Sequence, residues 1–400
     1  MTPSIFSLDH HDAFRVLRLR GSAYERGRQH GLALKESVRF FRDAFYRDLL
    51  YARSRMLGVS LNGIFITLAA RMERFIPREL REEMLGVADG AGISYRDVLI
   101  INSFDDAIHG LSKLAPLMQW FQRARGYFAC SSFVRLGDSG PIHGRNLDYM
   151  VADSAVDPNG VVTRILRENV IVFVHEPDQG YQFTSVAWPG YVGIVTGMNA
   201  AGLSLACHTS WTPGETVHGI PLPLLYRHVV QYSPSLANAE QRLRRARRTI
   251  GNNISLASSR DHTARAIELA PRQVASRAPH AGTLAVTNHF QDPTLSAPQA
   301  RAGWLFPNSV NRLDRLHALL PATASTMTDA EAVLSDAEAT SPDLGDWDCL
   351  VNPGTIYSTV FDPTRLRLSV RIFDQPDRPF SQVDLTEHGM PRPLEASESA

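Results

Sequence analysis

The spacing of apolar residues changes near residue 127, and this change constrains the fold more than any other feature of the sequence. Before it, apolar residues recur at helical spacing, as in Leu34, Val38 and Phe41, which predicts amphipathic helices. After it, short β-branched and aromatic runs alternate with turn residues, which predicts strands and hairpins. The order predicts an α+β protein in which a mainly helical N-terminal segment precedes antiparallel sheets.

The helical segment carries its own start signals. Ser22 with Glu25 has the spacing of a capping box, and Pro77 predicts the start of a second helix. Gly27 and Gly31 lie one turn apart in the first helix, where glycine costs about 1 kcal/mol relative to alanine. We interpret this pair as a close contact between the helix and a sheet.

The second region alternates predicted strands with predicted helices, so helices are expected to cover the outer faces of the sheets. The predicted strands are 131–136, 170–174, 181–188, 192–196, 203–208, 254–258, 264–269, 283–287, 355–361 and 365–372, and the predicted helices are 222–232, 235–250, 309–320 and 329–337.

Composition excludes several classes of protein. Forty-one basic residues balance 41 acidic ones, which argues against a general nucleic-acid binder, and 44% apolar residues argue against disorder. Three scattered cysteines predict neither a disulfide framework nor a cysteine zinc site, and the histidines show no metal-binding spacing. The N-terminus lacks a signal-peptide pattern and no stretch predicts a membrane helix. We expect a cytoplasmic protein without a metal, whose tail after about residue 392 is flexible.

The densest group of reactive residue types lies where the two regions join. Cys130 heads a predicted strand, and a hairpin return brings Arg145 and Asp148 back toward it. A lone cysteine at such a position is usually a small buried hydrophobe. A nearby cation and a carboxylate are what a thiolate nucleophile needs, so Cys130 is a candidate nucleophile.

The order of several short motifs resembles a known family. These motifs are GSAYERGRQHG at 21–31, GVADGAGI at 86–93, GYFACSSF at 126–133, HGRNLDY at 143–149, WPGYVGIVTGMNAAGL at 188–203 and TNHF at 287–290. In this order they resemble the cysteine N-terminal-nucleophile hydrolases, and within them the isopenicillin-N acyltransferase family. Choloylglycine hydrolases and acid ceramidase are more distant relatives.

The resemblance implies a four-layer αββα sandwich and a precursor that cuts itself between Ala129 and Cys130. Residues 1–129 would then form a helical leader chain, and residues 130–400 the catalytic core, with the two chains held together by packing. The free α-amino group of Cys130 would act as the general base, since an α-amine titrates near pH 7.7 to 8.

The resemblance also implies roles for single residues. Asp148 would hold the α-amine, and Arg145 would lie against the nucleophile. Asn288 matches the asparagine that donates to the oxyanion, where one donor is typically worth about 100 to 1000-fold in rate. Arg312 matches a distal arginine of the active site, although a solvated helix cation is an equal alternative.

Five further residues are expected to bind substrate. Trp188 and Tyr191 are candidates for the wall of an acyl pocket. A backbone N–H near Gly190 and Tyr191 would complete the oxyanion hole or line that pocket. Asn199 belongs to the Gly-Met-Asn motif. Where choloylglycine hydrolases place a further asparagine after the Gly-Leu strand, either His208 or Thr209 replaces that donor, or the role is absent.

The expected function is hydrolysis of a linear N-acyl amide, or transfer of its acyl group to an amine, through a thioester on Cys130. The expected partner is a small acyl amide, with homo-oligomerisation left open. No cofactor is expected, although a coenzyme A thioester is a candidate acyl donor. Five arginines near 242–248 form either a dock for coenzyme A phosphates or, as we favour, a solvated helix face.

Two other hypotheses remain open at this point. One is an uncleaved Cys-His hydrolase in which His143, His208 or His289 activates Cys130. The other is a binding or assembly protein that has the same fold and no catalysis.

Overall fold

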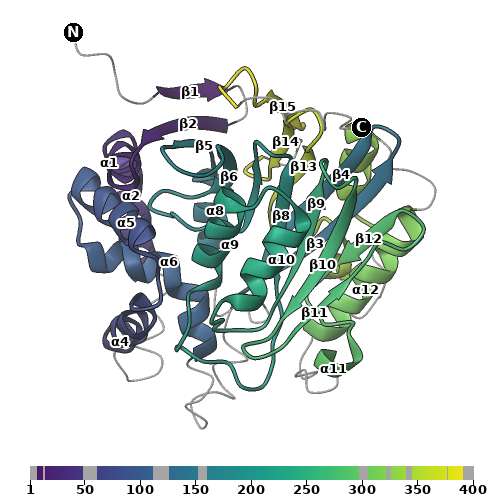
Figure 1. Ribbon diagram of the computed structural model, residues 1–400, viewed down its shortest axis with the longest axis horizontal. Helices are drawn as coiled ribbons and strands as arrows, with labels where there is room; N and C mark the ends of the chain where they lie inside the picture. The colour runs from purple at the N-terminus through teal and green to yellow at the C-terminus, as the bar shows by residue number, and fades with distance from the viewer. Residues whose placement is uncertain are drawn as a thin grey trace, which may run out of the picture.

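The computed structural model describes residues 7–11, 14–47, 61–110, 126–151, 160–296, 305–320, 326–338, 345–375 and 377–390. Two sheets lie face to face, with β3 and β4 of one sheet against β8 and β9 of the other (Figure 1). The tail after residue 392, for which we predicted flexibility, lies outside the described residues.

The larger sheet has nine strands and the smaller one six. Neighbouring strands run antiparallel except β2 and β5, which are parallel. In spatial order, the larger sheet contains β1 (Ser7–His11), β2 (Phe14–Gly21), β5 (Ile171–Pro177), β6 (Phe183–Ala187), β7 (Thr196–Asn199), β8 (Leu203–Thr209), β9 (Asn252–Ser258), β10 (Thr263–Leu269) and β11 (Val274–Arg277), and the smaller one β12 (Thr283–Val286), β3 (Gly126–Gly137), β4 (Gly140–Val151), β13 (Thr355–Asp362), β14 (Arg367–Ile372) and β15 (Ser381–Asp384).

Helices cover the outer face of each sheet, so the predicted four-layer αββα sandwich is confirmed. The larger sheet is covered by α1 (Ala23–Ala33), α9 (Leu222–Tyr232) and α10 (Leu236–Arg245), and the smaller one by α12 (Leu305–Leu319) and α13 (Met327–Leu334). Helix α8 (Val161–Glu168) packs against the apolar cluster between the sheets, through Val162 and Leu166. The remaining helices are α2 (Lys35–Ala44), α4 (Leu61–Glu73), α5 (Arg78–Ala91), α6 (Tyr95–Gly110), α11 (Pro293–Ser296) and the 3-10 turn Gly345–Asp348.

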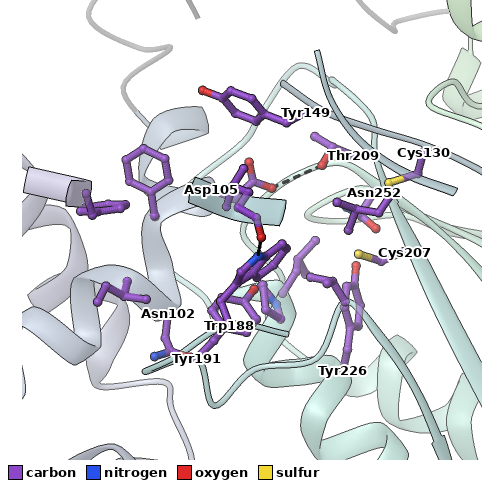
Figure 2. Close-up of a pocket in the computed structure, with 18 of the residues that line it drawn as sticks. Asn102, Asp105, Cys130, Tyr149, Trp188, Tyr191, Cys207, Thr209, Tyr226 and Asn252 are labelled. Carbon is purple, nitrogen blue, oxygen red and sulfur yellow. Dashed lines mark hydrogen bonds between the residues drawn. The ribbon is translucent and has the colours of Figure 1, made fainter. Parts of the chain in front are cut away.

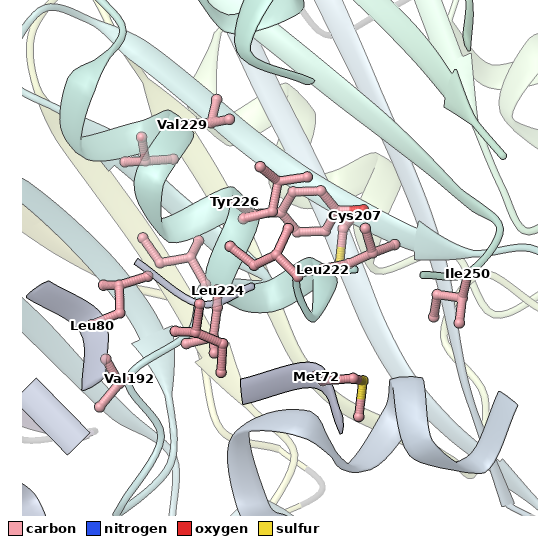
Figure 3. Close-up of a cluster of buried hydrophobic side chains, with 14 of the residues drawn as sticks. Met72, Leu80, Val192, Cys207, Leu222, Leu224, Tyr226, Val229 and Ile250 are labelled. Atoms are coloured by element: carbon pink, nitrogen blue, oxygen red, sulfur yellow. The ribbon is translucent and has the colours of Figure 1, made fainter. Parts of the chain in front are cut away.

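The two faces of β9 show how alternation separates the layers. Ile254 and Leu256 join the apolar cluster under the helices, which Figure 3 shows around α9. Ser255 points the other way, because successive side chains of a strand lie on opposite faces. Its hydroxyl bonds to Ser132 Oγ and His143 Nε2 of the smaller sheet, both at 2.8 Å. The layer between the sheets is therefore polar as well as apolar.

The N-terminal segment is mainly helical, as predicted, but it also contains β1 and β2, which extend the larger sheet through the pairing of β2 with β5. Two predictions about elements are wrong. Residues 192–196 form no strand until Thr196, because they pass under α9, where Ile194 N–H bonds to the Pro223 carbonyl. The helix predicted over 235–250 ends at Arg245.

The paired glycines of the first helix contact a second helix, and not a sheet as we predicted. A Cβ at Gly27 would overlap the carbonyl oxygen of Glu83, and one at Gly31 that of Val87. Both acceptors belong to α5, whose Gly86 lies equally close to α1. Glycine is needed here because the backbones of α1 and α5 touch.

Replacing Gly27 with Ala tests this contact. We expect the free energy of unfolding to fall by about 2 kcal/mol or more, because the helices must separate to admit the methyl group. Urea denaturation measures this loss. Arg28→Ala, at an exposed position of the same helix, is the control and should change the value by less than about 0.5 kcal/mol. Similar losses in the two variants would contradict the contact.

Candidate active site

The hairpin of β3 and β4 places the candidate nucleophile. Cys130 stands opposite Leu147, and Ala129 opposite Asp148, in an unbroken antiparallel register. The strand continues through the Ala129–Cys130 bond, and the Cys130 side chain is 2% exposed. Predicting a hairpin was enough to predict that these residues meet.

Arg145 lies against the thiol, with Nη2 3.0 Å from Cys130 Sγ. The same guanidinium donates to the carbonyls of Val195 and Cys207 and to the hydroxyl of Thr196. Burial raises the pKa of the Cys130 thiol, and the charge of Arg145 opposes that rise. The arginine therefore favours the thiolate in a place where burial disfavours it.

Asp148 is a fully buried carboxyl group with one oxygen unused. Its Oδ1 accepts a hydrogen bond from Thr355 Oγ1 at 2.8 Å, whereas Oδ2 has no partner. Burial raises the pKa of Asp148 to about 6, and the charge of Arg312 limits the rise. A buried unpaired acceptor is costly, so Oδ2 is suited to accept hydrogen bonds from a cationic group.

Asn288 and Arg312 enclose the backbone of Cys130. Asn288 Oδ1 accepts from the Cys130 N–H at 2.8 Å and from Arg312 Nη2 at 3.0 Å. Arg312 Nη1 donates to the Cys130 carbonyl and to Ser131 Oγ, both at 2.7 Å. Arg312 is fully buried, so the alternative of a solvated helix cation is wrong. Asn288 Nδ2 uses one hydrogen on the Thr209 carbonyl at 2.9 Å and has a second to donate.

Cys130 opens into an apolar pocket that holds about 920 Å³ of empty space, including the part open to solvent (Figure 2). Trp188 and Tyr191 lie in its wall, as the sequence predicts. Sequence reasoning missed the part that the N-terminal segment contributes, because helical periodicity does not tell which apolar residues face a cavity. These residues are Phe41, Phe45, Ile101, Asn102, Phe104 and Asp105.

Asn102 is a positioning residue that the sequence analysis also missed. Its Nδ2 donates to the Gly190 carbonyl at 2.9 Å, and its Oδ1 accepts from Val192 N at 2.7 Å and Gly193 N at 3.0 Å. It ties α6 to the loop that carries Tyr191. The available sequence signal was an asparagine directly after the apolar run Val98–Ile101.

The backbone donors proposed for an oxyanion hole are already engaged. Gly190 N–H bonds to His30 Nε2 at 2.9 Å, and Tyr191 N–H to the Trp188 carbonyl at 3.1 Å. Gly190 adopts a left-handed φ of 82°, a turn conformation that favours glycine over other residues. Because both N–H groups are engaged, the geometry does not support the oxyanion alternative, whereas Tyr191 does line the pocket, which was the other alternative.

Asn199 and His208 do not line the pocket. Asn199 donates to the carbonyls of Val230 and Ser233 and accepts from two backbone N–H groups of its own turn. His208 Nδ1 lies 3.3 Å from the Asn253 carbonyl, and burial lowers its pKa well below the usual range. These hydrogen bonds give Asn199 a structural role, and the substrate contacts predicted for the two residues stay a prediction.

No described histidine hydrogen-bonds to the Cys130 thiol. His143 bonds to Ser204 and Ser255, and His289 bonds to Ser309. Burial lowers the pKa of His143 to about 3 and that of His289 to about 4. The geometry therefore does not support the Cys-His hypothesis. Within the described ranges, no group of three or more His, Cys, Asp or Glu residues is arranged to hold a metal ion.

Comparison with known families agrees with the fold. The sequence profile of the acyl-coenzyme A:6-aminopenicillanic acid acyl-transferase family matches residues 135–378. The chain belongs to this family. The match begins after Cys130, so it includes Arg145, Asp148, Asn288 and Arg312 but not the candidate nucleophile.

The chain is also similar to proteins of two organisms. It is 30% identical over 246 residues to an uncharacterised protein of Archaeoglobus fulgidus, a match that covers 59% of this chain and 40% of that protein. It is 24% identical over 277 residues to protein dcd1A of Dictyostelium discoideum, covering 63% and 58% of the two chains. The chain thus spans about half the length of these relatives.

Two solved structures have a related shape. One is an N-acylethanolamine-hydrolyzing acid amidase ortholog of Caenorhabditis elegans, with a TM-score of 0.43 and 18% identity over 62% of this chain and 95% of that one. The other is a penicillin V acylase of Agrobacterium tumefaciens, with a TM-score of 0.39 and 15% identity over 64% of this chain and 87% of that one.

None of the described helices combines the length and the apolar character that spanning a bilayer requires.

Replacing Asp148 with Asn tests the cost of the buried carboxyl group. The comparison uses a Cys130→Ala background, so that both proteins lack the thiol next to the carboxyl. We expect Asp148→Asn to be more stable at pH 8, by on the order of 1 kcal/mol or more, because the carboxylate must be ionised while buried.

The pH dependence gives the control for that comparison. Asp148 has a folded pKa of about 6, above its unfolded value, so the wild-type residue loses stability as pH rises from about 4 to 6. The two variants should therefore unfold at similar temperatures near pH 4 and differ above pH 6. Lower stability of Asp148→Asn at pH 8 would contradict this assignment.

Proposed function

We propose that this chain is a self-processing cysteine amidohydrolase or acyltransferase whose nucleophile is Cys130. The observation that carries the proposal is the thiol of Cys130 at the wall of an apolar pocket, with Arg145 Nη2 3.0 Å away. Family membership supports acyl chemistry, and the conjunction of thiol, cation and pocket supports a thioester intermediate at this residue.

Processing adds one water across the Ala129–Cys130 peptide bond. The products are the carboxylate of Ala129 and the α-amino group of Cys130. The bond lies in a paired strand. Asn288 accepts a hydrogen bond from the N–H of Cys130, and Arg312 donates one to its carbonyl. These contacts support the proposal that the Ala129–Cys130 bond is positioned for attack by the Cys130 thiol.

The released α-amine is the general base in this proposal. It takes the proton of the thiol on the same residue as Sγ attacks the substrate carbonyl, and it returns that proton to the leaving amine. The unused Oδ2 of Asp148 is the natural partner of the resulting ammonium group. The second hydrogen of Asn288 Nδ2 is the candidate donor to the oxyanion.

The acyl group of the substrate occupies the apolar pocket. Phe41, Phe45 and Phe104 of the leader form one side, and Val162, Leu166 and Trp188 lie on the core side. The leader must therefore stay bound to the core after cleavage. Water is the acceptor that we favour, because transfer to an amine needs a second binding site.

Intact mass and N-terminal sequencing of the purified protein test processing. We expect the wild type to contain a chain that begins with Cys130, and Cys130→Ala to remain whole. Cys207→Ala is the matched control, since Cys207 lines the same pocket and should not affect cleavage. An uncut wild-type chain would contradict the free-amine mechanism.

The pH dependence of turnover tests the base. With a panel of N-acyl amides that differ in acyl length, we expect kcat/KM to rise through an apparent pKa of about 7 to 8, as for an α-amine. Activity in an uncut chain, or a Cys130→Ala variant that still turns over substrate, would contradict the proposal.

A further inference from the structure

The arginine-rich segment near the end of α10 divides into two groups with different surroundings. Arg244 bonds to Glu240 at 2.6 Å, one turn away on the same helix. Arg248 is buried and donates to the carbonyls of Leu243 at 2.6 Å and Ala246 at 2.9 Å. These two arginines serve the structure of the helix and its end.

The other three, Arg242, Arg245 and Arg247, line a second hollow. It encloses about 1050 Å³ of empty space, including the part open to solvent. Its remaining lining is apolar or uncharged, and it includes His228, whose imidazole contacts Arg242. The other lining residues are Phe75, Pro77, Ile220, Leu225, His228, Asn238, Gln241 and Ala246.

This hollow concentrates positive charge without acidic partners. None of its lining residues is acidic, and no carboxylate of the described chain lies within 4 Å of these three guanidinium groups. The whole chain is electrically neutral, so the local imbalance is not a consequence of a basic composition. Three like charges around one concavity favour an anion between them.

Two of the arginines are held in place by neighbouring rings. Arg242 Nη1 lies 3.2 Å from His228 Nε2, and its guanidinium lies over the ring of Tyr232. Burial lowers the pKa of His228, so the imidazole is neutral and accepts this hydrogen bond. Arg247 lies over the ring of Phe75. Groups that are already oriented lose less entropy when they bind a ligand.

The end of a helix normally repels anions, because its last carbonyls carry partial negative charge. Here Arg248 covers those carbonyls. The partial negative charge at the end of α10 therefore does not offset the positive charge of the guanidinium groups at the hollow.

We propose that this hollow binds a small phosphorylated molecule, with adjacent phosphate groups on Arg242, Arg245 and Arg247 and an apolar part over Phe75 and Leu225. Guanidinium groups bind phosphate through paired, charge-assisted hydrogen bonds. A concave site with three cations fits a compact polyanion better than an extended surface such as a membrane or a nucleic acid.

The site is separate from the acyl pocket, although both use α9. Leu225 and His228 face the hollow, whereas Leu222 and Tyr226 face the acyl pocket. Figure 3 shows Leu222, Leu224 and Tyr226 within the buried cluster of α9. The proposal therefore does not depend on the proposed function of Cys130.

Isothermal titration calorimetry of the full-length Cys130→Ala protein with inorganic pyrophosphate tests the site. We expect saturable binding that weakens as NaCl rises, and Arg245→Gln with Arg247→Gln to raise Kd by about tenfold or more. Both side chains are exposed, so the double variant should fold, which its thermal unfolding checks. The matched control is Arg244→Gln, which removes one charge from the same helix outside the hollow and should change Kd by less than about twofold.

Three results would overturn the proposal. The first is no binding of pyrophosphate to the Cys130→Ala protein at low salt. The second is an equal loss of affinity when Arg244→Gln is added to it. The third is binding to vesicles rich in phosphatidylserine that exceeds binding of pyrophosphate and depends on the same arginines. The second would show a nonspecific charge effect, and the third a membrane contact.

Discussion

The buried guanidinium of Arg145 is the interaction on which the rest of this structure depends. It extends from β4 of the smaller sheet and donates to groups carried by the larger sheet and its connections, at Val195, Thr196 and Cys207. Burying a cation costs several kcal/mol unless its donors are satisfied. Among the described residues, no carboxylate lies within 4 Å of the Arg145 guanidinium. Carbonyl oxygens, a hydroxyl oxygen and a thiol accept its hydrogen bonds instead and offset the cost of burying its charge. The sheets must therefore keep their spacing for the arginine to remain bonded.

This requirement also determines the chemistry at Cys130. A thiol that is 2% exposed would by burial alone hold its proton more tightly. The same arginine that joins the sheets opposes this effect at 3.0 Å. Asp148 and Arg312 extend the pattern, since each is fully buried and each shifts the pKa of the other toward its charged form. The buried charged groups of the site are thus stabilised by one another and by backbone carbonyls.

The N-terminal segment is part of the sandwich and of the pocket. Its strand β2 pairs with β5, its helix α1 contacts α5 backbone to backbone, and Asn102 of α6 holds the loop that carries Tyr191. Three of its phenylalanines line the cavity next to Cys130. An N-terminal segment that contributes both to the sheet and to the pocket is an integral part of the fold.

Local signals determined much of this protein from sequence alone. The change of periodicity indicated helices and then antiparallel strands, and a hairpin between 130 and 148 was enough to bring Cys130, Arg145 and Asp148 together, because register depends on nearby residues. Motif order indicated the family.

Only the tertiary structure decided which polar groups already have hydrogen-bond partners. Asn199 and the N–H of Gly190 make structural hydrogen bonds, whereas Oδ2 of Asp148 is left unpaired. It also decided that Gly27 meets a helix and that five neighbouring arginines have different environments. These outcomes depend on residues far apart in the chain, and a pattern along the sequence carries no information about which distant groups satisfy each donor or acceptor.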